Sequence, residues 1–166
     1  MARPIAEDKF HNYAYQIKTL GDIKTSGGFT AGAALPELTI DMVEYRAGDG
    51  PTFKEKYPGL VTVGTNLVLS RGVVLRNSEL GQWAIKWAKG EPYRTEIELT
   101  HYHGQANACR KFKLHNAFPI RWKTGTDLDA QSSDINIEEL EIAYEWFDIE
   151  EGTDDMPVRL TPNIPV

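Results

Sequence analysis

Three histidines are the residues of this sequence most suited to metal chemistry. His101 and His103 are two residues apart, so in a strand both imidazoles would point to the same face. His115, on a neighbouring predicted strand, could add a third ligand. Imidazole suits zinc and related transition metals, which could serve a metal-dependent enzyme or a small-molecule binder. Residues 104–107 are Gly, Gln, Ala and Asn, so no carboxylate follows the two histidines closely enough in sequence to serve as a further ligand.

A calcium loop is the second candidate, and it fails on geometry. Asp127, Asp129 and Glu138 occupy positions 1, 3 and 12 of the loop pattern. Position 6 is Ser132, where the sharp turn of such a loop requires glycine. Nucleophile, phosphate-binding, dinucleotide-binding and paired-cysteine motifs are also missing. We therefore expect no catalytic residue, no cofactor and no metal, and favour an assembly module over an enzyme.

Length and composition indicate one folded domain. The 166 residues are 41% hydrophobic and 25% charged, which is ordinary globular usage. No apolar run reaches about 18 residues, and Glu7 and Asp8 stand where a signal peptide would be apolar. We therefore expect folding in the cytosol, and the single cysteine, Cys109, agrees with a reducing compartment.

Charge is distributed unevenly along the chain. Residues 134–166 contain ten acidic residues and one basic residue, whereas residues 1–133 contain 14 acidic and 17 basic residues. The net charge of −6 argues against a broad nucleic-acid-binding surface. The asymmetry suggests either an acidic tail or complementary faces that meet between copies of the chain.

Alternation of apolar and polar residues predicts a chain made mainly of strands. The expected strands are residues 13–19, 38–45, 61–69, 95–102 and 109–116. One helix is expected at residues 77–89, where Leu80, Trp83 and Trp87 form an apolar stripe and Gly90 follows.

The last two of these strands are expected to pair as a hairpin. Setting Ile97 opposite Leu114 groups the apolar residues on one face. The same register sets Glu98 opposite Lys113 on the other face. Residues 104–107 then form a four-residue turn, a common hairpin length.

Periodicity alone leaves residues 135–147 open between a helix and a strand. Leu140, Ile142 and Tyr144 alternate with acidic or small residues, as in a strand. Ile137, Leu140 and Tyr144 also fit a helical stripe. A strand would need a bulge in its first half, because the apolar phase changes there.

A long loop is expected after the second strand. Residues 47–60 read AGDGPTFKEKYPGL and show no clear period. A connection of fourteen residues in a compact domain usually has a function or is disordered. We therefore expect this loop to have a function.

Blocks of residues spread over most of the chain follow a family pattern. They are EYRAGDG at 44–50, KYPG at 56–59, LSRGV at 69–73, LGQW at 80–83, FKLHNAFP at 112–119, DLDA at 127–130 and IEELEIA at 137–143. In this order and spacing they resemble phage tail tube proteins of the T-even type, over residues 10–148. Within that family the sequence is most similar to inner tube proteins of contractile injection systems and pyocin-like particles.

The resemblance implies the fold. Residues 1–148 would form a mainly β tail tube domain, a β-sandwich or partly closed barrel with one flanking helix at about 77–89, related to the Hcp tube protein of type VI secretion. Residues 135–147 are a strand in this family, which favours the bulged strand. Residues 149–166 would be a C-terminal extension, acidic and then proline-rich, that is extended or poorly ordered.

The resemblance also implies a structural function. Hexameric rings would stack into a hollow tube, which a contracting sheath drives through a target envelope. The implied partners are further copies of the chain, a sheath protein, and baseplate and tube-terminating proteins, with cargo or DNA in the lumen and no membrane insertion by this chain alone. The chain would be made in the bacterial cytoplasm and join a virion or an extracellular contractile particle. Phage, bacteriocin and injection system all fit, as do a bulk tube subunit and a ring near the baseplate.

The resemblance further implies which residues join subunits, because the loop after the second strand contacts neighbours in this family. The expected ring-contact residues are Gly48, Asp49, Gly50, Pro51, Phe53, Lys54, Lys56 and Tyr57. Glu139, Glu141 and Glu145 form a candidate acidic contact face for these lysines on a neighbouring copy.

Two other functions stay open from the sequence. One is a cupin-like metal-binding enzyme or small-molecule binder that uses His101, His103 and His115. The other is a carbohydrate-binding β-sandwich, which would use exposed aromatic residues such as Tyr102 and Trp122.

Overall fold

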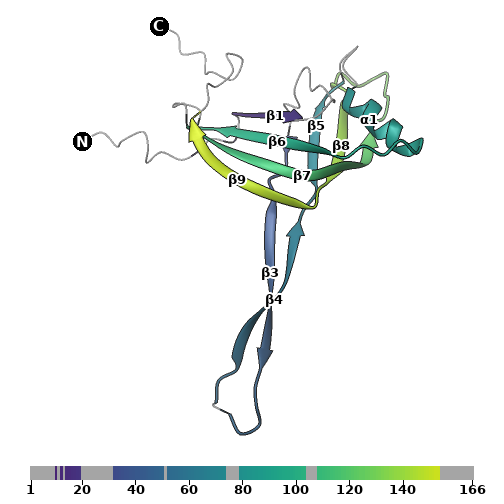
Figure 1. The fold of residues 1–166 in the computed structure, drawn as a ribbon. Helices are drawn as coiled ribbons and strands as arrows, with labels where there is room; N and C mark the ends of the chain where they lie inside the picture. Colours follow the sequence, from purple (N-terminus) through teal and green to yellow (C-terminus); the bar gives the residue numbers. More distant parts are fainter. Residues whose placement is uncertain are drawn as a thin grey trace.

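The computed structural model describes residues 10, 12, 14–19, 32–50, 52–73, 79–103 and 108–153. Their elements are β1 (Tyr15–Thr19), β2 (Gly32–Ala33), β3 (Glu37–Tyr45), β4 (Glu55–Gly64), β5 (Leu67–Gly72), α1 (Glu79–Ala88), β6 (Thr95–Tyr102), β7 (Ala108–Lys123), β8 (Ile137–Ala143) and β9 (Trp146–Thr153). Figure 1 shows two parts: a β-sheet body that carries α1, and a long arm made of β3 and β4. The predicted fold class, mainly β with one flanking helix, is confirmed.

The sheet of the body is built around the long strand β7. Its order is β1-β6-β7-β8-β5-β2, and β9 pairs with β7 as well. The first half of β7 lies between β6 and β9, whereas the second half pairs with β8. The change of partners falls between Ala117 and Phe118, and the register with β8 shifts just beyond it, between Pro119 and Arg121. A proline fits such an irregular point of a strand, because it has no N–H to donate to a ladder.

The core forms from alternate positions of these strands. In β5, Leu67 and Leu69 are buried while Val68 and Ser70 are partly exposed. That period of two is typical of a sheet with one face buried. Strands β1, β5, β6, β7 and β8 and the helix all contribute to one cluster: Ile17, Leu67, Leu69, Trp83, Ile97, Leu99, Phe112, Leu114, Ala117, Leu140 and Ile142.

A buried ion pair joins β5, β7 and β8. Arg71 Nε donates to Glu138 Oε1, and both side chains are almost completely buried. Trp122 Nε1 also donates to Glu138, at 3.3 Å to Oε2. Burying two charges is favourable only when such contacts replace their hydration, so this group depends on all three residues.

The helix lies where its apolar stripe predicted it. Trp83 is buried, and Trp83 and Trp87 both donate their indole N–H to the carbonyl oxygen of Tyr93, at 2.8 and 2.9 Å. Gly90 has φ +85° and ends the helix, because this left-handed conformation favours glycine. The predicted first residues, 77 and 78, lie outside the described residues.

The predicted hairpin register is confirmed. Ile97 lies opposite Leu114, and Glu98 lies opposite Lys113. Glu98 is buried, however, and Lys113 Nζ contacts Glu150 Oε1 of β9 at 2.8 Å. The sequence pattern did not reveal this partner, because it depends on β9 returning to the other side of β7. The predicted turn 104–107 lies outside the described residues.

The strand predicted at residues 61–69 is wrong as a single element. β4 ends at Gly64 and β5 begins at Leu67, with Thr65 at φ 46° between them. Tyr144 Oη donates to the carbonyl oxygens of Gly64 and Thr65, at 3.3 and 2.8 Å. The chain turns here from the arm into the body. The alternation of apolar and polar residues continues on both sides of the turn, so the sequence pattern alone indicated one strand.

The loop predicted at residues 47–60 is shorter than expected. Residues from Glu55 onward belong to β4 and pair with β3, so the connection comprises residues 46–54. Glycine and proline in KYPG suggested a loop, yet Pro58 and Gly59 lie beside a bulge in the ladder. Bulges tolerate both residue types.

The single bulged strand predicted at residues 135–147 is also wrong. β8 begins at Ile137, and the chain turns at Tyr144 and Glu145 before β9 begins. Glu145 N donates to the carbonyl oxygen of His115 at 3.0 Å, where the chain passes from the second half of β7 to the first. β9 continues five residues past Asp148, the predicted domain boundary, and residues from 154 onward lie outside the described residues.

Candidate assembly surfaces

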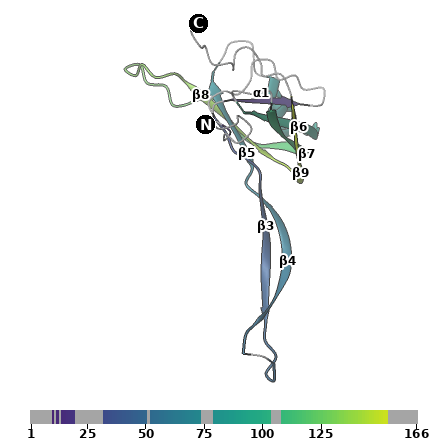
Figure 2. The ribbon, with the colours of Figure 1, turned by 90° about the vertical axis from the view of Figure 1, so that its left-hand side faces the viewer.

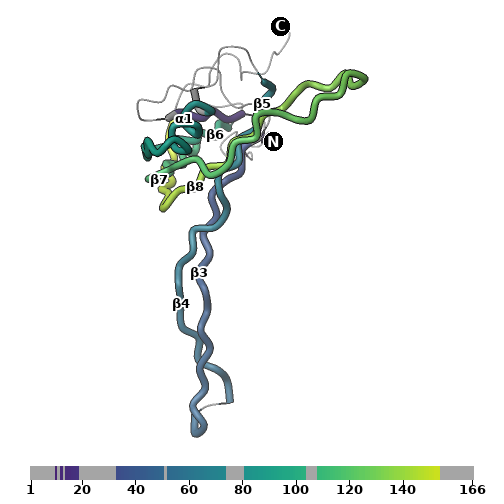
Figure 3. The backbone as a smooth tube through the Cα atoms, turned by 90° about the vertical axis from the view of Figure 1, so that its right-hand side faces the viewer, coloured from purple at the N-terminus to yellow at the C-terminus, as the bar shows by residue number. Residues whose placement is uncertain are grey.

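The arm is a two-stranded ribbon that extends away from the body. Figures 2 and 3 show it from two further sides, and it projects from the body in both. Within the described ranges no other strand pairs with β3 or β4. Every residue of β3 is exposed, including Leu38, Ile40 and Met42. Large exposed apolar surfaces of this kind are typical of interaction sites.

The predicted ring-contact residues lie at the outer end of the arm. Gly48, Asp49, Gly50, Phe53 and Lys54 are in the connecting loop, Lys56 and Tyr57 are in β4, and Pro51 lies outside the described residues. Lys54 Nζ contacts Glu44 Oε2 of β3 at 2.7 Å, so this lysine already has a carboxylate partner in its own chain.

The predicted acidic residues lie in the body and also have partners there. Glu139 accepts from Arg121 at 3.0 Å, and Glu141 accepts from Asn66 at 2.7 Å. Glu145 accepts from Arg94, and from Asn116 at 2.7 Å. The three carboxylates therefore do not form one unpaired acidic patch within the chain. Their role in binding another copy stays a prediction.

The three histidines do not form a metal centre. His101 lies opposite Arg110 of β7, and His115 is five residues further along that strand, or about 17 Å away. His101 and His103 both contact the ring of Phe10, with ring centroids 5.2 and 5.3 Å apart. Among the described residues, no three His, Cys, Asp or Glu side chains are placed to hold a metal ion together.

The other two chemical alternatives also lack support in the structure. Tyr102, proposed as an exposed glycan-binding residue, is only 1% exposed, and Trp122 is partly buried beside Gly81. In the calcium pattern, Glu138 is buried and paired with Arg71, and Asp129 Oδ1 accepts from Gln131 N at 2.9 Å. These residues serve the fold.

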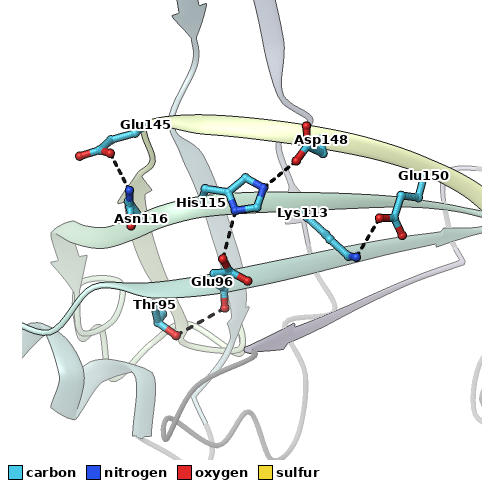
Figure 4. A network of polar contacts seen from close by, with 8 residues as sticks. All are labelled: Thr95, Glu96, Lys113, His115, Asn116, Glu145, Asp148 and Glu150. Atoms are coloured by element: carbon cyan, nitrogen blue, oxygen red, sulfur yellow. Dashed lines mark hydrogen bonds and ion pairs between the residues drawn. The ribbon is translucent and has the colours of Figure 1, made fainter.

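His115 instead joins β6, β7 and β9 (Figure 4). Its Nδ1 lies 3.1 Å from Glu96 Oε1, and its Nε2 lies 2.8 Å from Asp148 Oδ2. Carboxylates only accept hydrogen bonds, so both contacts are hydrogen bonds only when both ring nitrogens carry a proton. The bond to Asp148, followed by the bond to Glu96, raises the pKa of His115 above its ordinary value.

Further contacts between opposite charges join β7 and β9, one on the face of His115 and one on the opposite face. Lys113 pairs with Glu150 at 2.8 Å, and Arg110 Nε lies 3.4 Å from Glu151 Oε1. The bond to Glu150 raises the pKa of Lys113 above its ordinary value. These exposed contacts add to the backbone ladder that pairs β9 with β7.

A second projection was not predicted from the sequence. Residues 124–136, between β7 and β8, extend from the body as the green loop of Figure 3. Leu128 is 92% exposed and Ile135 is 76% exposed. The sequence signal for it is two apolar residues among aspartates and serines.

The sequence analysis also missed the apolar residues along the arm. Alternation predicts that Leu38, Ile40 and Met42 share one face of a strand, and it predicts an apolar face for Val61 as well, yet all four are about half exposed. Periodicity carries no information on whether a second layer covers that face.

No helix in the part of the chain that the structure describes is long and apolar enough to span a membrane.

Comparisons with known proteins identify relatives of this chain. The family model described as T4-like virus tail tube protein gp19 matches residues 11–148. No curated protein sequence matches.

Three solved structures have a similar fold. A chain of the anti-feeding prophage (AFP) baseplate, 6-fold symmetrised, has 21% identity and a TM-score of 0.71, with 90% of this chain and 97% of that chain covered. A chain of the PVC sheath-tube complex, from an extracellular contractile injection system in the extended state, has 22% identity and a TM-score of 0.70, covering 88% and 94%. A chain of the PVC sheath/tube terminator has 23% identity and a TM-score of 0.70, covering 87% and 98%.

Proposed function

Since this chain belongs to the T4-like virus tail tube protein family, we propose that it is the repeating structural subunit of the inner tube of a contractile, phage-tail-like particle. Six copies would form a ring, and rings would stack into a hollow tube. The similar chain from a 6-fold symmetrised baseplate supports this ring size. The observation that carries the proposal is the family match, which spans nearly all of the described body and arm.

The open sheet of the body supports ring formation. β1 and β2 are the two ends of the strand order, and β9 has β7 as its one partner among the described strands. Free strand edges tend to pair with other chains unless they are protected. Head-to-tail contacts around a closed ring would pair or cover such edges without leaving a free end.

The arm supports stacking between rings. It reaches far from the body (Figure 1), and the described members of the proposed contact set lie in its connecting loop and at the start of β4: Gly48, Asp49, Gly50, Phe53, Lys54, Lys56 and Tyr57. Pro51 completes the proposed set. Glu139, Glu141 and Glu145 are the proposed acidic contacts on a neighbour. Each of these carboxylates already has a partner in its own chain and would have to share it. The charges would therefore fix the relative position of two copies more than they would raise the affinity between them.

The proposed partners follow from the same assignment. A sheath protein would surround the tube, and baseplate and terminating proteins would close its two ends, as the names of the similar structures suggest. Cargo or DNA would pass through the bore. We propose that the chain acts mechanically, without a catalytic step, and is made in the bacterial cytoplasm before it joins the particle.

Electron microscopy of the purified full chain tests this function. At high concentration we expect six-fold rings and tubes. The mass of the assemblies, measured by light scattering, should then rise in multiples of the mass of one ring. A chelator should leave both unchanged, because the described residues offer no metal cluster. A monomer of constant mass at every concentration would overturn the proposal.

A further inference from the structure

The second half of β7 has a free strand edge, although β7 stands in the middle of the sheet order. β8 and β9 follow one another along one side of β7, because Phe118 lies opposite Ala143 and His115 lies opposite Trp146. β6 occupies the other side of β7, but only as far as Ala117. Beyond Ala117, no described strand pairs with this side. An unpaired edge of this kind can accept a further strand.

The helix α1 lies beside this free edge and forms a groove with it. The rings of Trp87 and Phe118 have their centroids 5.3 Å apart, and Gly81 lies against the ring of Trp122. The helix therefore runs antiparallel to this half of β7. The space between them has a volume of about 380 Å³. We call it the edge groove, and its walls include Ala84, Ile85, Ala88, Pro119, Ile120 and Trp122.

The edge groove is apolar along its length and basic near both ends. Ile120 is 48% exposed, so the groove offers an apolar wall to a ligand. Lys86 and Lys89 are exposed at the end of α1, and Lys123 is exposed at the end of β7. These features fit an extended peptide that has apolar side chains at alternate positions and acidic residues beside them.

The chain itself contains such a peptide directly after β9. Residues 156–160 read Met, Pro, Val, Arg and Leu, and they follow two aspartates; all lie outside the described residues. In a strand, Met156, Val158 and Leu160 would share one face, and their backbone groups would point to the same neighbour. Pro157 has no N–H and would then point away from that neighbour, where an edge strand tolerates proline.

This peptide cannot reach the edge groove of its own copy. Thr153 lies opposite Ala108, and Pro119, at the nearer end of the groove, is eleven residues further along β7. That is roughly 36 Å along the strand, or about 25 Å across if the strand bends through a right angle. Met156 is only three residues beyond Thr153, and three extended residues span at most about 10 Å. Figure 1 accordingly shows the end of β9 and α1 at opposite ends of the body.

We infer that residues 156–160 of one copy add as a short antiparallel strand to the free edge of β7 in a second copy, with their apolar side chains in the edge groove. The inference rests on the proposed assembly of copies and adds a contact that does not involve the arm. Every strand pair in the described structure is antiparallel. In that direction, Asp155 comes to lie beside Lys123, and Leu160 comes to lie beside Ala88.

Disulfide cross-linking between two full-length variants tests this contact. One variant carries Ala88→Cys and the other carries Leu160→Cys, with a size tag on one of them, and the native Cys109 is buried. After mild oxidation of the mixture under assembly conditions, we expect a mixed dimer on a non-reducing gel. Arg159→Cys, which faces the other way, and Met156→Cys, at the other end of the segment, are the matched controls. Each should cross-link to Ala88→Cys about tenfold less than Leu160→Cys does.

A charge reversal tests the direction of the added strand. Lys123→Glu in the groove variant should lower the yield of mixed dimer about threefold, because the substitution replaces an attractive exposed pair by a repulsive one. Asp155→Lys in the other variant should restore the yield. A yield that ignores both substitutions would overturn the antiparallel placement.

Other outcomes separate this contact from the tube function. Equal cross-linking of residues 156, 159 and 160 would show a segment that meets the groove without pairing, which overturns the inference. Absence of the mixed dimer also overturns it, and the tube function then stands if the unsubstituted chain still forms tubes in micrographs. A mixed dimer with the expected pattern, in a chain that forms no rings or tubes, would support the contact and overturn the proposed function.

Discussion

The strands of the arm and those of the body have the same sequence pattern, but their apolar faces differ in burial. Leu67 and Leu69 of β5 are buried, whereas Ile40 of β3 is 56% exposed, although both strands alternate apolar and polar residues. In the body, α1 and the folded sheet cover the apolar face. In the arm, no described residue of the chain covers it. Alternation therefore predicts that a strand has an apolar face, and a neighbouring layer decides whether that face belongs to a core or to an interface.

Their ion pairs differ in the same way. Arg71 and Glu138 in the body are 7% and 8% exposed, whereas Lys54 and Glu44 in the arm are 61% and 34% exposed. Removing one partner of a buried pair leaves an uncompensated charge, whereas water solvates the remaining partner of an exposed pair. The body should therefore depend on its ion pair for stability, and the arm should not.

The largest expected effect on stability is the loss of a core side chain. Leu114→Ala should lower the free energy of unfolding by about 3 to 5 kcal/mol, because it removes a completely buried side chain and leaves a cavity. Ile40→Ala in the arm is the matched control and should cost less than about 1 kcal/mol. Urea unfolding of the unassembled chain measures both. Equal losses would show that the arm folds as part of the core.

The buried ion pair should have the next largest effect. Glu138→Ala should cost about 3 kcal/mol, because Arg71 loses its carboxylate and the indole N–H of Trp122 loses its acceptor. Glu44→Ala should cost about 0.5 kcal/mol or less, since its lysine is exposed. Denaturant midpoints at neutral pH test this contrast. It would be contradicted by a Glu138 variant as stable as the parent.

Shortening the arm should hardly change the stability of the body. Residues 46–54 can be replaced by Asn-Gly, because Tyr45 lies opposite Glu55 and a two-residue turn can close this hairpin. The thermal midpoint should stay within about 2 °C, equivalent to a few tenths of a kcal/mol. Tube growth in micrographs should be lost, because the outermost contact residues are gone. Long tubes from this variant would show that the tip loop does not join rings.

The smallest expected effect concerns His115 and the attachment of β9. Its pKa is raised in the folded chain, so its stabilising contribution is complete below the unfolded value of about 6.5 and is lost as pH rises through the folded value. Above that pH the neutral ring donates to only one of Glu96 and Asp148. The urea midpoint of the parent should therefore fall relative to that of His115→Gln as pH rises from 6 to 9. Lys54→Gln in the arm is the control and should show no such relative change.

Most of what the sequence predicted correctly involves residues close together along the chain. The helix follows from one apolar stripe and a terminal glycine, and both features are local. The pairing of β6 with β7 follows from two adjacent strands, since only one register groups apolar residues on one face. The tail tube family was also identifiable, because its blocks keep their order whatever the packing.

The candidate site was predicted only in part. A loop was correctly predicted after the second strand, yet its boundaries were wrong because Pro58 and Gly59 belong to a bulged strand, and its role in subunit contacts stays a prediction. The apolar residues of the arm were not recognised as surface, and the partners of Glu139, Glu141 and Glu145 were not foreseen. Each of these depends on residues that are distant in sequence and become neighbours only through β7 and the turn at Thr65.

By itself, the sequence determined the strand periodicity, the helix, the central hairpin register and the family, because backbone geometry and side-chain alternation act over a few residues. The tertiary structure alone decided that the run from Val61 to Leu69 divides at Thr65, sending one half into water and the other into the core. It also decided that acidic β9 returns to β7, where the side chains of Lys113 and His115 meet its carboxylates. Burial and charge pairing depend on which surfaces meet in space, and an apolar or charged residue has the same sequence signature on a covered face as on a free one.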